Sequence, residues 1–153
     1  MSAAGLDVFD RTLQGTHIWL DQIRAQMGPD RQLAWHVLGA VLHATRDRLP
    51  LELAVHLGAQ LPLLVRGLYY DQWRPSTEPL KLRSREEFLA HVAEGLAHTR
   101  PVNAAKAAHA VFGVLDHFVD PGQVRKVRDA LPQDVKELWP ETTREGRGAR
   151  SAA

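Results

Sequence analysis

Residues 40–69 read AVLHATRDRLPLELAVHLGAQLPLLVRGLY, and residues 110–139 read AVFGVLDHFVDPGQVRKVRDALPQDVKELW. The second stretch aligns with the first at an offset of seventy positions without a gap. The identical pairs are Ala40 and Ala110, Val41 and Val111, Leu61 and Leu131, Pro62 and Pro132, Val65 and Val135, and Leu68 and Leu138. A repeat of this kind is typical of helical units that bury a shared core. We therefore expect two similar units in a pseudo-two-fold arrangement.

Both units are interrupted at the same place by a Leu-Pro pair. Pro62 and Pro132 fall inside apolar runs, and an interior proline breaks a helix. Other helix starts are marked by a capping box at Ser84 with Glu87, and by Asp120 before a proline. Alternating β-branched residues and Asn-Gly turns are nearly absent. The sequence predicts an all-α fold of about eight helices in two tandem pseudo-repeats that form one compact helical bundle.

The expected helices span about 6–27, 31–48, 50–60, 62–70, 84–98, 101–118, 121–131 and 132–139. In the first of them, one apolar stripe steps by three and four residues, and it comprises Leu6, Phe9, Leu13, Leu20, Ile23 and Met27. We expect residues 1–5 to be a flexible N-terminus and residues 6–140 to be the helical domain. Within it, repeat one covers about 6–73 and repeat two about 84–139. Residues 141–153 lack apolar periodicity and are expected to be a disordered tail.

Composition restricts the classes of protein to consider. The chain has 153 residues, no cysteine and a net charge of +1. The absence of cysteine fits a reducing compartment, and the N-terminus has no signal-peptide pattern. The greasiest stretch, 51–70, contains too many polar residues for a bilayer span. We therefore expect a cytoplasmic protein that does not enter a membrane, and the near-neutral charge disfavours a nucleic-acid partner.

Histidines on the second helix form a candidate metal or ligand site. His36, His43 and Asp47 are spaced at i, i+7 and i+11, which places them on one helix face. Together with His17 from the first helix, or His56 from the third, they could ligate a metal ion. The alternative is that Asp47 pairs with a neighbouring arginine while the imidazoles lie on a partly wet surface. No cofactor is assigned on this spacing alone.

A second cluster combines aromatic and cationic residues, and it comprises Tyr69, Tyr70, Trp73, Arg74, Lys81, Arg83 and Arg85. Tyr, Trp and Arg are enriched at protein interfaces. Tyr70, Trp73 and Arg74 are therefore candidates for partner binding. The alternative is that Tyr69 and Trp73 seal a junction inside the protein, because Tyr69 aligns with Trp139 at the seventy-residue offset.

Several segments resemble the DUF2267 family of bacterial and archaeal proteins. They are THIWL at 16–20, AVLHATRDRLPLELAVHLGAQLPLLVRGLYYDQWRP at 40–75, SREEFL at 84–89 and ALPQDVKELWP at 130–140. The resemblance extends over about residues 6–140. It implies a small cytoplasmic helical protein, and it brings no established activity and no catalytic residues.

The sequence contains no GxGxxG, Walker A or HExxH motif and no nucleophile elbow. We assign no catalytic residue and expect a non-enzymatic helical interaction module that binds an unknown protein partner or forms a homo-oligomer. Two alternatives remain open. One is a His-lined ligand or metal-binding bundle, and the other is a weak nucleic-acid binder that uses cations of the 71–85 region and of the tail.

Overall fold

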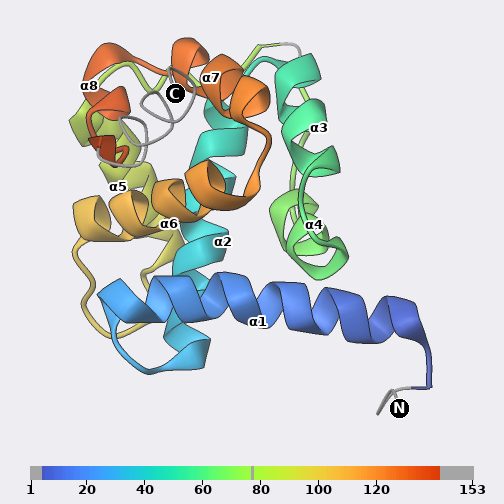
Figure 1. Ribbon diagram of the computed structural model, residues 1–153. Coiled ribbons are helices and arrows are strands. Elements are labelled where there is room, and N and C mark those ends of the chain that lie inside the picture. The colour runs from blue at the N-terminus through green and yellow to red at the C-terminus, as the bar shows by residue number, and fades with distance from the viewer. Residues whose placement is uncertain (1–4, 77, 142–153) are drawn as a thin grey trace, which may run out of the picture.

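Prolines and polar caps divide the chain into eight α-helices within residues 5–76 and 78–141, the part that the computed structural model describes (Figure 1). The helices are α1 Asp7–Met27, α2 Arg31–Arg48, α3 Leu51–Ala59, α4 Leu63–Tyr70, α5 Arg85–Gly95, α6 Ala104–Phe118, α7 Pro121–Ala130 and α8 Gln133–Lys136. The predicted all-α fold of about eight helices is confirmed. Most of the predicted flexible N-terminus and disordered tail, residues 1–4 and 142–153, lies outside the described residues. Within those residues, no helix is both long enough and apolar enough to cross a membrane.

The sequence signals that start helices act as expected. Pro62 and Pro132 precede α4 and α8 with nearly identical backbone angles, φ −55° with ψ 150° and φ −55° with ψ 151°. At the start of α5, Ser84 Oγ accepts a hydrogen bond from the Glu87 N–H at 3.1 Å. The Glu87 carboxylate in turn accepts the N–H of Arg83 at 3.1 Å, one residue earlier than a standard capping box uses.

Three helix boundaries differ from the prediction by three residues, and one of them is the end of α8, at Lys136 rather than at 139. Helix α6 begins at Ala104 because Asn103 is extended, with φ −73° and ψ 112°, and its side chain accepts the Lys106 N–H at 3.0 Å. An asparagine cap of this kind outranks the proline at 101 as a start signal. Helix α5 ends at Gly95 rather than near residue 98. The real connection between α5 and α6 is therefore longer than the pattern of apolar residues indicated.

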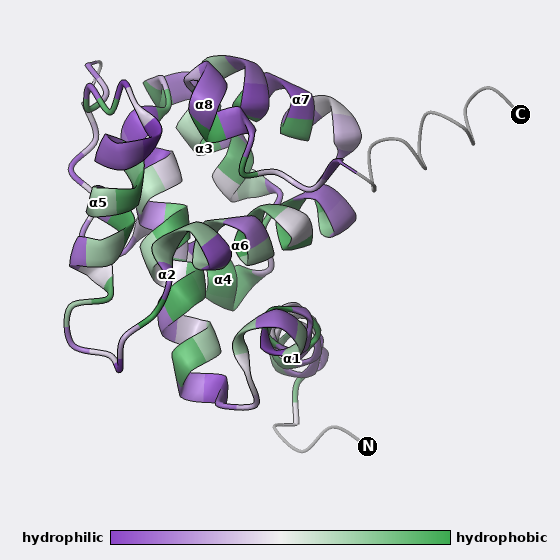
Figure 2. Ribbon diagram, turned by 90° about the vertical axis from the view of Figure 1, so that its left-hand side faces the viewer, coloured by the Kyte–Doolittle hydropathy of each residue, from purple (hydrophilic) through white to green (hydrophobic). Residues whose placement is uncertain are grey.

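Helices α2 and α6 supply much of the core. Their fully buried side chains are Val37, Leu38, Val41 and Leu42 on α2, and Val111, Phe112, Val114 and Leu115 on α6. Helix α2 contacts α1, α4, α5 and α6. In Figure 2 the hydrophobic, green parts of α2, α4 and α6 gather in the interior, whereas α7 and α8 are largely hydrophilic on the outside.

Some contacts between helices occur in corresponding pairs, whereas those of α2 with α4, α3 with α4 and α6 with α7 have no counterpart of similar extent. Helix α1 contacts α2 and α5 contacts α6, while α1 also contacts α6 and α2 contacts α5. The contact of α1 with α4 corresponds in the same way to that of α5 with α8. Exchanging helices 1–4 with helices 5–8 therefore reproduces these contacts, as a pseudo-two-fold repeat would. The internal repeat itself stays a prediction.

Helix α1 is buried over only part of its length. Its buried residues are Thr16, Trp19, Leu20 and Ile23, all in the C-terminal two thirds. The N-terminal part, residues 6–15, which we call the α1 arm, runs past α2 and α6 toward the free N-terminus (Figure 1). The apolar stripe predicted for this helix is therefore continuous in sequence, but the core covers only its second part.

Candidate functional site

The aromatic residues at the end of α4 form a stack. The Tyr70 and Trp73 rings lie 5.4 Å apart, centroid to centroid, at 23° to each other. Tyr69 is fully buried, and its hydroxyl donates to the Ala54 carbonyl at 2.7 Å. The Tyr70 hydroxyl donates to the Val55 carbonyl at 3.2 Å. Tyr69 is thus a packing residue, as its alignment with a tryptophan indicated, and half-buried Tyr70 is held against α3.

A buried arginine anchors this end of α4. Arg46, which is 5% exposed, donates through Nη1 to the carbonyls of Tyr69 at 2.7 Å and Asp71 at 3.1 Å. The last carbonyls of a helix lack partners within the helix, so the guanidinium satisfies acceptors that would otherwise be orphaned. Its Cζ lies 6.0 Å from the centroid of the Trp73 ring, within cation–π range. Sequence reasoning identified Trp73 but not the arginine that positions it.

Asp47 joins this arginine to α5. Its Oδ1 accepts from Arg46 Nε at 2.9 Å, and its Oδ2 accepts from His91 Nε2 at 3.0 Å. Burial favours a raised pKa for Asp47, but the hydrogen bonds from His91 and Arg46 outweigh burial and hold that pKa below its usual value. The hydrogen bond to Asp47 raises the pKa of His91 against the opposing effect of burial. The predicted alternative for Asp47, pairing with a neighbouring arginine, is the arrangement found.

The structure does not bring the predicted histidine cluster together. His17 and His36 are exposed on α1 and α2. His43 Nε2 donates to the Leu68 carbonyl at 2.7 Å, and burial lowers the pKa of His43. Among the described residues, no three His, Asp or Glu side chains are placed to hold a metal ion. The histidine that pairs with Asp47 is instead His91, forty-four positions away, and no local sequence pattern marks it.

A cleft lies where the end of α2 meets the segment that joins α4 to α5. It has two hollows, of about 230 and 390 Å³, and both are walled by Glu78, Pro79 and Leu80. The first hollow is also lined by residues that include Arg46, Asp47, Trp73 and Arg74, and the second by Arg48, Lys81 and Arg83. We call the two hollows together the connector cleft. It contains Trp73 and Arg74 from the predicted partner-binding set, but Tyr70 is absent from its walls.

A second feature is an exposed apolar surface beside the α1 arm. Leu6, Phe9 and Leu13 on the arm are 52%, 48% and 43% exposed, and Leu63 and Leu64 on α4 are 54% and 42% exposed. We call these five residues the apolar face.

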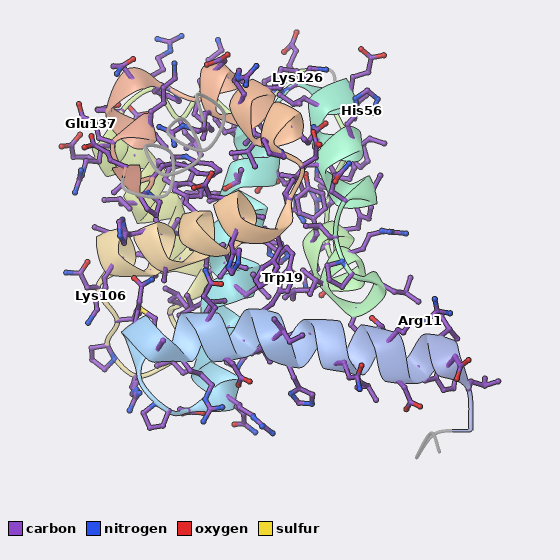
Figure 3. All side chains as sticks on the ribbon, in the orientation of Figure 1. Arg11, Trp19, His56, Lys106, Lys126 and Glu137 are labelled. Carbon is purple, nitrogen blue, oxygen red and sulfur yellow. The ribbon has the colours of Figure 1, made fainter. Side chains whose placement is uncertain are left out.

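The two parts of the apolar face belong to helices in contact. The backbone N–H of Leu64 donates to Thr12 Oγ1 at 3.0 Å, which joins the first turn of α4 to the arm. Figure 3 shows Arg11 near the free end of the arm and Trp19 where α1 reaches the core. The sequence placed the arm residues in a helical stripe, and it gave no sign that the core would leave them uncovered.

Comparison with known proteins agrees with the resemblance noted in the sequence. No curated protein matches the chain. Residues 16–138 match the family model DUF2267, whose description is "Uncharacterized conserved protein". This match covers most of the chain, from the middle of α1 to the turn after α8. The protein therefore belongs to the DUF2267 family.

Proposed function

We propose that this protein is a non-enzymatic helical interaction module that self-associates through the apolar face. The observation that carries the proposal is the exposure of five large apolar side chains on two contacting helices. On α1, Phe9 and Leu13 continue the stripe that Leu20 and Ile23 bury in the core. A helix stripe with this period is the type of surface that another helix covers.

The area of the apolar face matches what a dimer needs. Five large apolar side chains, each about half exposed, present roughly 350–450 Å², because an aromatic side chain such as that of Phe9 offers about 150–250 Å² and a leucine somewhat less. Monomeric proteins rarely expose apolar patches beyond about 300–600 Å², and the largest patch is often functional. A standard interface buries about 800 Å² on each partner, of which about 57% is apolar, or roughly 450 Å².

Hydrogen-bonding groups beside the apolar face favour a second copy of this chain as the occupant. Asp10 and His17 are seven residues apart and so lie on one side of α1, Asp10 toward its N-terminus. Two arms packed antiparallel about a two-fold axis would bring Asp10 of one copy toward His17 of the other, twice per dimer. The net charge of +1 adds little repulsion between copies.

The hydroxyl groups of the described serines support a non-enzymatic role. Ser84 Oγ caps α5, and Ser76 Oγ accepts the N–H of Glu78 at 3.1 Å. The Asp47–His91 pair resembles the orienting half of a catalytic triad, but the other ring nitrogen of His91 lies 3.5 Å from Glu94 rather than beside a nucleophile. A cytoplasmic location is part of the proposal, supported by the lack of cysteine.

The test is the molar mass of the full chain by light scattering after size-exclusion chromatography, at about 5 to 500 µM, a range that detects micromolar self-association. We expect twice the 17.1 kDa of one chain at the upper end. The variant with Phe9→Ser and Leu13→Ser is expected to stay at the mass of one chain. Because both side chains are about half exposed, this variant should fold, which its circular dichroism checks.

The matched control is Ile18→Ser. Ile18 is 52% exposed on the same helix but lies off the stripe. We expect this variant to associate as the wild type does. A wild-type chain that has the mass of one copy at every concentration refutes self-association. Equal loss of association in the control and in the double variant refutes the apolar face as the interface.

A further inference from the structure

The second hollow of the connector cleft concentrates positive charge. Its walls carry three cationic side chains, Arg48, Lys81 and Arg83, against the carboxylate of Glu78, whereas the first hollow has two cations and two carboxylates. The whole chain has a net charge of only +1, so the cleft is more positive than the protein as a whole. A concave surface lined by one sign of charge attracts ligands of the opposite sign.

The carboxylate of Glu78 offsets only part of this charge. Glu78 stands on the wall that both hollows share. Lys81 and Arg83 are exposed and Arg48 is half-buried, and the described part of the chain offers none of the three an ion pair within 4.0 Å. Three cations are therefore available to a ligand.

The described residues that line the second hollow offer no aromatic ring on which a base could stack. Trp73 lines the first hollow and is already stacked on Tyr70. The available groups are thus guanidinium and ammonium N–H donors. Guanidinium groups match the oxygens of phosphoryl groups in pairs.

We propose that the second hollow of the connector cleft binds a small phosphoryl anion, held by Arg48, Lys81 and Arg83. Its volume of about 390 Å³ lies near the lower end of the range for drug-sized ligands, about 300–1,000 Å³, so a compact anion fits better than a nucleotide. This site is separate from the apolar face and does not depend on self-association.

The experiment is isothermal titration calorimetry of the full chain with inorganic pyrophosphate, inorganic phosphate and succinate at constant ionic strength. Pyrophosphate is expected to bind most tightly, because it offers the most charge to several cations, and succinate at least about tenfold more weakly, because it lacks phosphoryl oxygens. The variant Lys81→Gln with Arg83→Gln should weaken pyrophosphate binding by about tenfold or more. Raising the salt concentration should weaken it as well.

The matched control removes two exposed cations from α7, with Arg125→Gln and Lys126→Gln, and so changes the net charge equally. Binding in this variant should stay within about twofold of the wild type, because α7 residues do not line the cleft. No heat of binding from the wild type at about 10 mM pyrophosphate overturns the proposal. Equal weakening in both variants also overturns it, because the anion would then be attracted by the net charge of the protein rather than by the cleft. Equal binding of succinate overturns the preference for phosphoryl groups.

Discussion

Replacing Gly58 with alanine tests the packing around Tyr70 more directly than any deletion would. Gly58 is buried near the end of α3, and a Cβ built there would overlap the Tyr70 hydroxyl oxygen and lie 2.6 Å from its Cζ. The ring of Tyr70 must therefore tilt away. That movement breaks the hydrogen bond to the Val55 carbonyl and disturbs the stack on Trp73.

The expected magnitude follows from two opposing effects. Alanine is favoured over glycine in a helix by up to about 1 kcal/mol. The lost hydrogen bond costs about 1 kcal/mol, and the aromatic contacts with Tyr69 and Trp73, which are weakened rather than removed, cost about 0.5–1.5 kcal/mol together. We expect Gly58→Ala to lower the free energy of unfolding by about 1–2 kcal/mol. For a chain of this length, that lowers the melting temperature by roughly 2–8 °C.

Urea unfolding followed by circular dichroism measures the effect, and Gly67→Ala is the matched control. Gly67 lies within α4, and a Cβ there meets no atom within 4 Å, so alanine should stabilise by up to about 1 kcal/mol. In a Tyr70→Ala background, Gly58→Ala should also become neutral or stabilising, which gives a coupling of about 2 kcal/mol between positions 58 and 70. If Gly58→Ala in the wild type stabilises as much as Gly67→Ala, the tight contact with Tyr70 does not exist.

Two further predictions concern the buried polar network. Arg46→Met should lower the free energy of unfolding, measured in urea, by about 3–5 kcal/mol, because it removes one partner of Asp47 and leaves carbonyls at the end of α4 without donors. The control Arg48→Met removes one hydrogen bond to the Leu82 carbonyl and should cost about 1 kcal/mol or less. The raised pKa of His91 gives stability that is fully present below pH 6.5 and is lost as the pH rises through that raised pKa. The lowered pKa of Asp47 gives stability that is fully present above pH 3.8 and is lost as the pH falls through that lowered pKa. The difference in melting temperature between the wild type and His91→Gln should therefore be larger at pH 5.5 than at pH 8.5, and an equal difference at both pH values would show that the pair is not charged.

Most of the fold was predictable because helix boundaries depend on local chemistry. Pro62 and Pro132 each interrupt an apolar run and directly precede a short helix. Ser84 caps α5 by accepting the N–H of Glu87, three residues later. The errors occurred where two local signals competed. Pro101 and Asn103 both mark a helix start, and the asparagine determined it because its side chain satisfies the Lys106 N–H.

The candidate site was less predictable because its partners are distant in sequence. Trp73 and Asp47 were identified from local patterns, but the contacts that define them come from the guanidinium of Arg46 and from His91 on α5. The exposure of Leu13 was equally hidden, because an apolar stripe has the same sequence whether a core or a second protein covers it. Only the placement of α2 and α6 along α1 distinguishes the two cases.

The predicted seventy-residue repeat allows the two halves of the chain to be compared position by position. At this offset Arg46 corresponds to Asp116, which is also buried, and an aspartate offers none of the N–H donors that Arg46 directs to the end of α4. Both halves direct a histidine to the corresponding leucine carbonyl, His43 to Leu68 at 2.7 Å and His109 to Leu138 at 2.9 Å.

The aromatic residues at the two ends differ as well. Trp139 is buried and stacks on Phe112 at 4.4 Å, where the first half has Tyr69, whose hydroxyl donates to the Ala54 carbonyl. Both ends thus combine an aromatic stack with a guanidinium, because the Cζ of Arg128 lies 5.2 Å from the Trp139 ring centroid as that of Arg46 lies 6.0 Å from the Trp73 ring centroid. In the first half the guanidinium also donates to carbonyls at the end of α4 and lines a cleft. We therefore infer that the connector cleft, formed where the two halves differ, is the part of the protein most worth testing for a ligand.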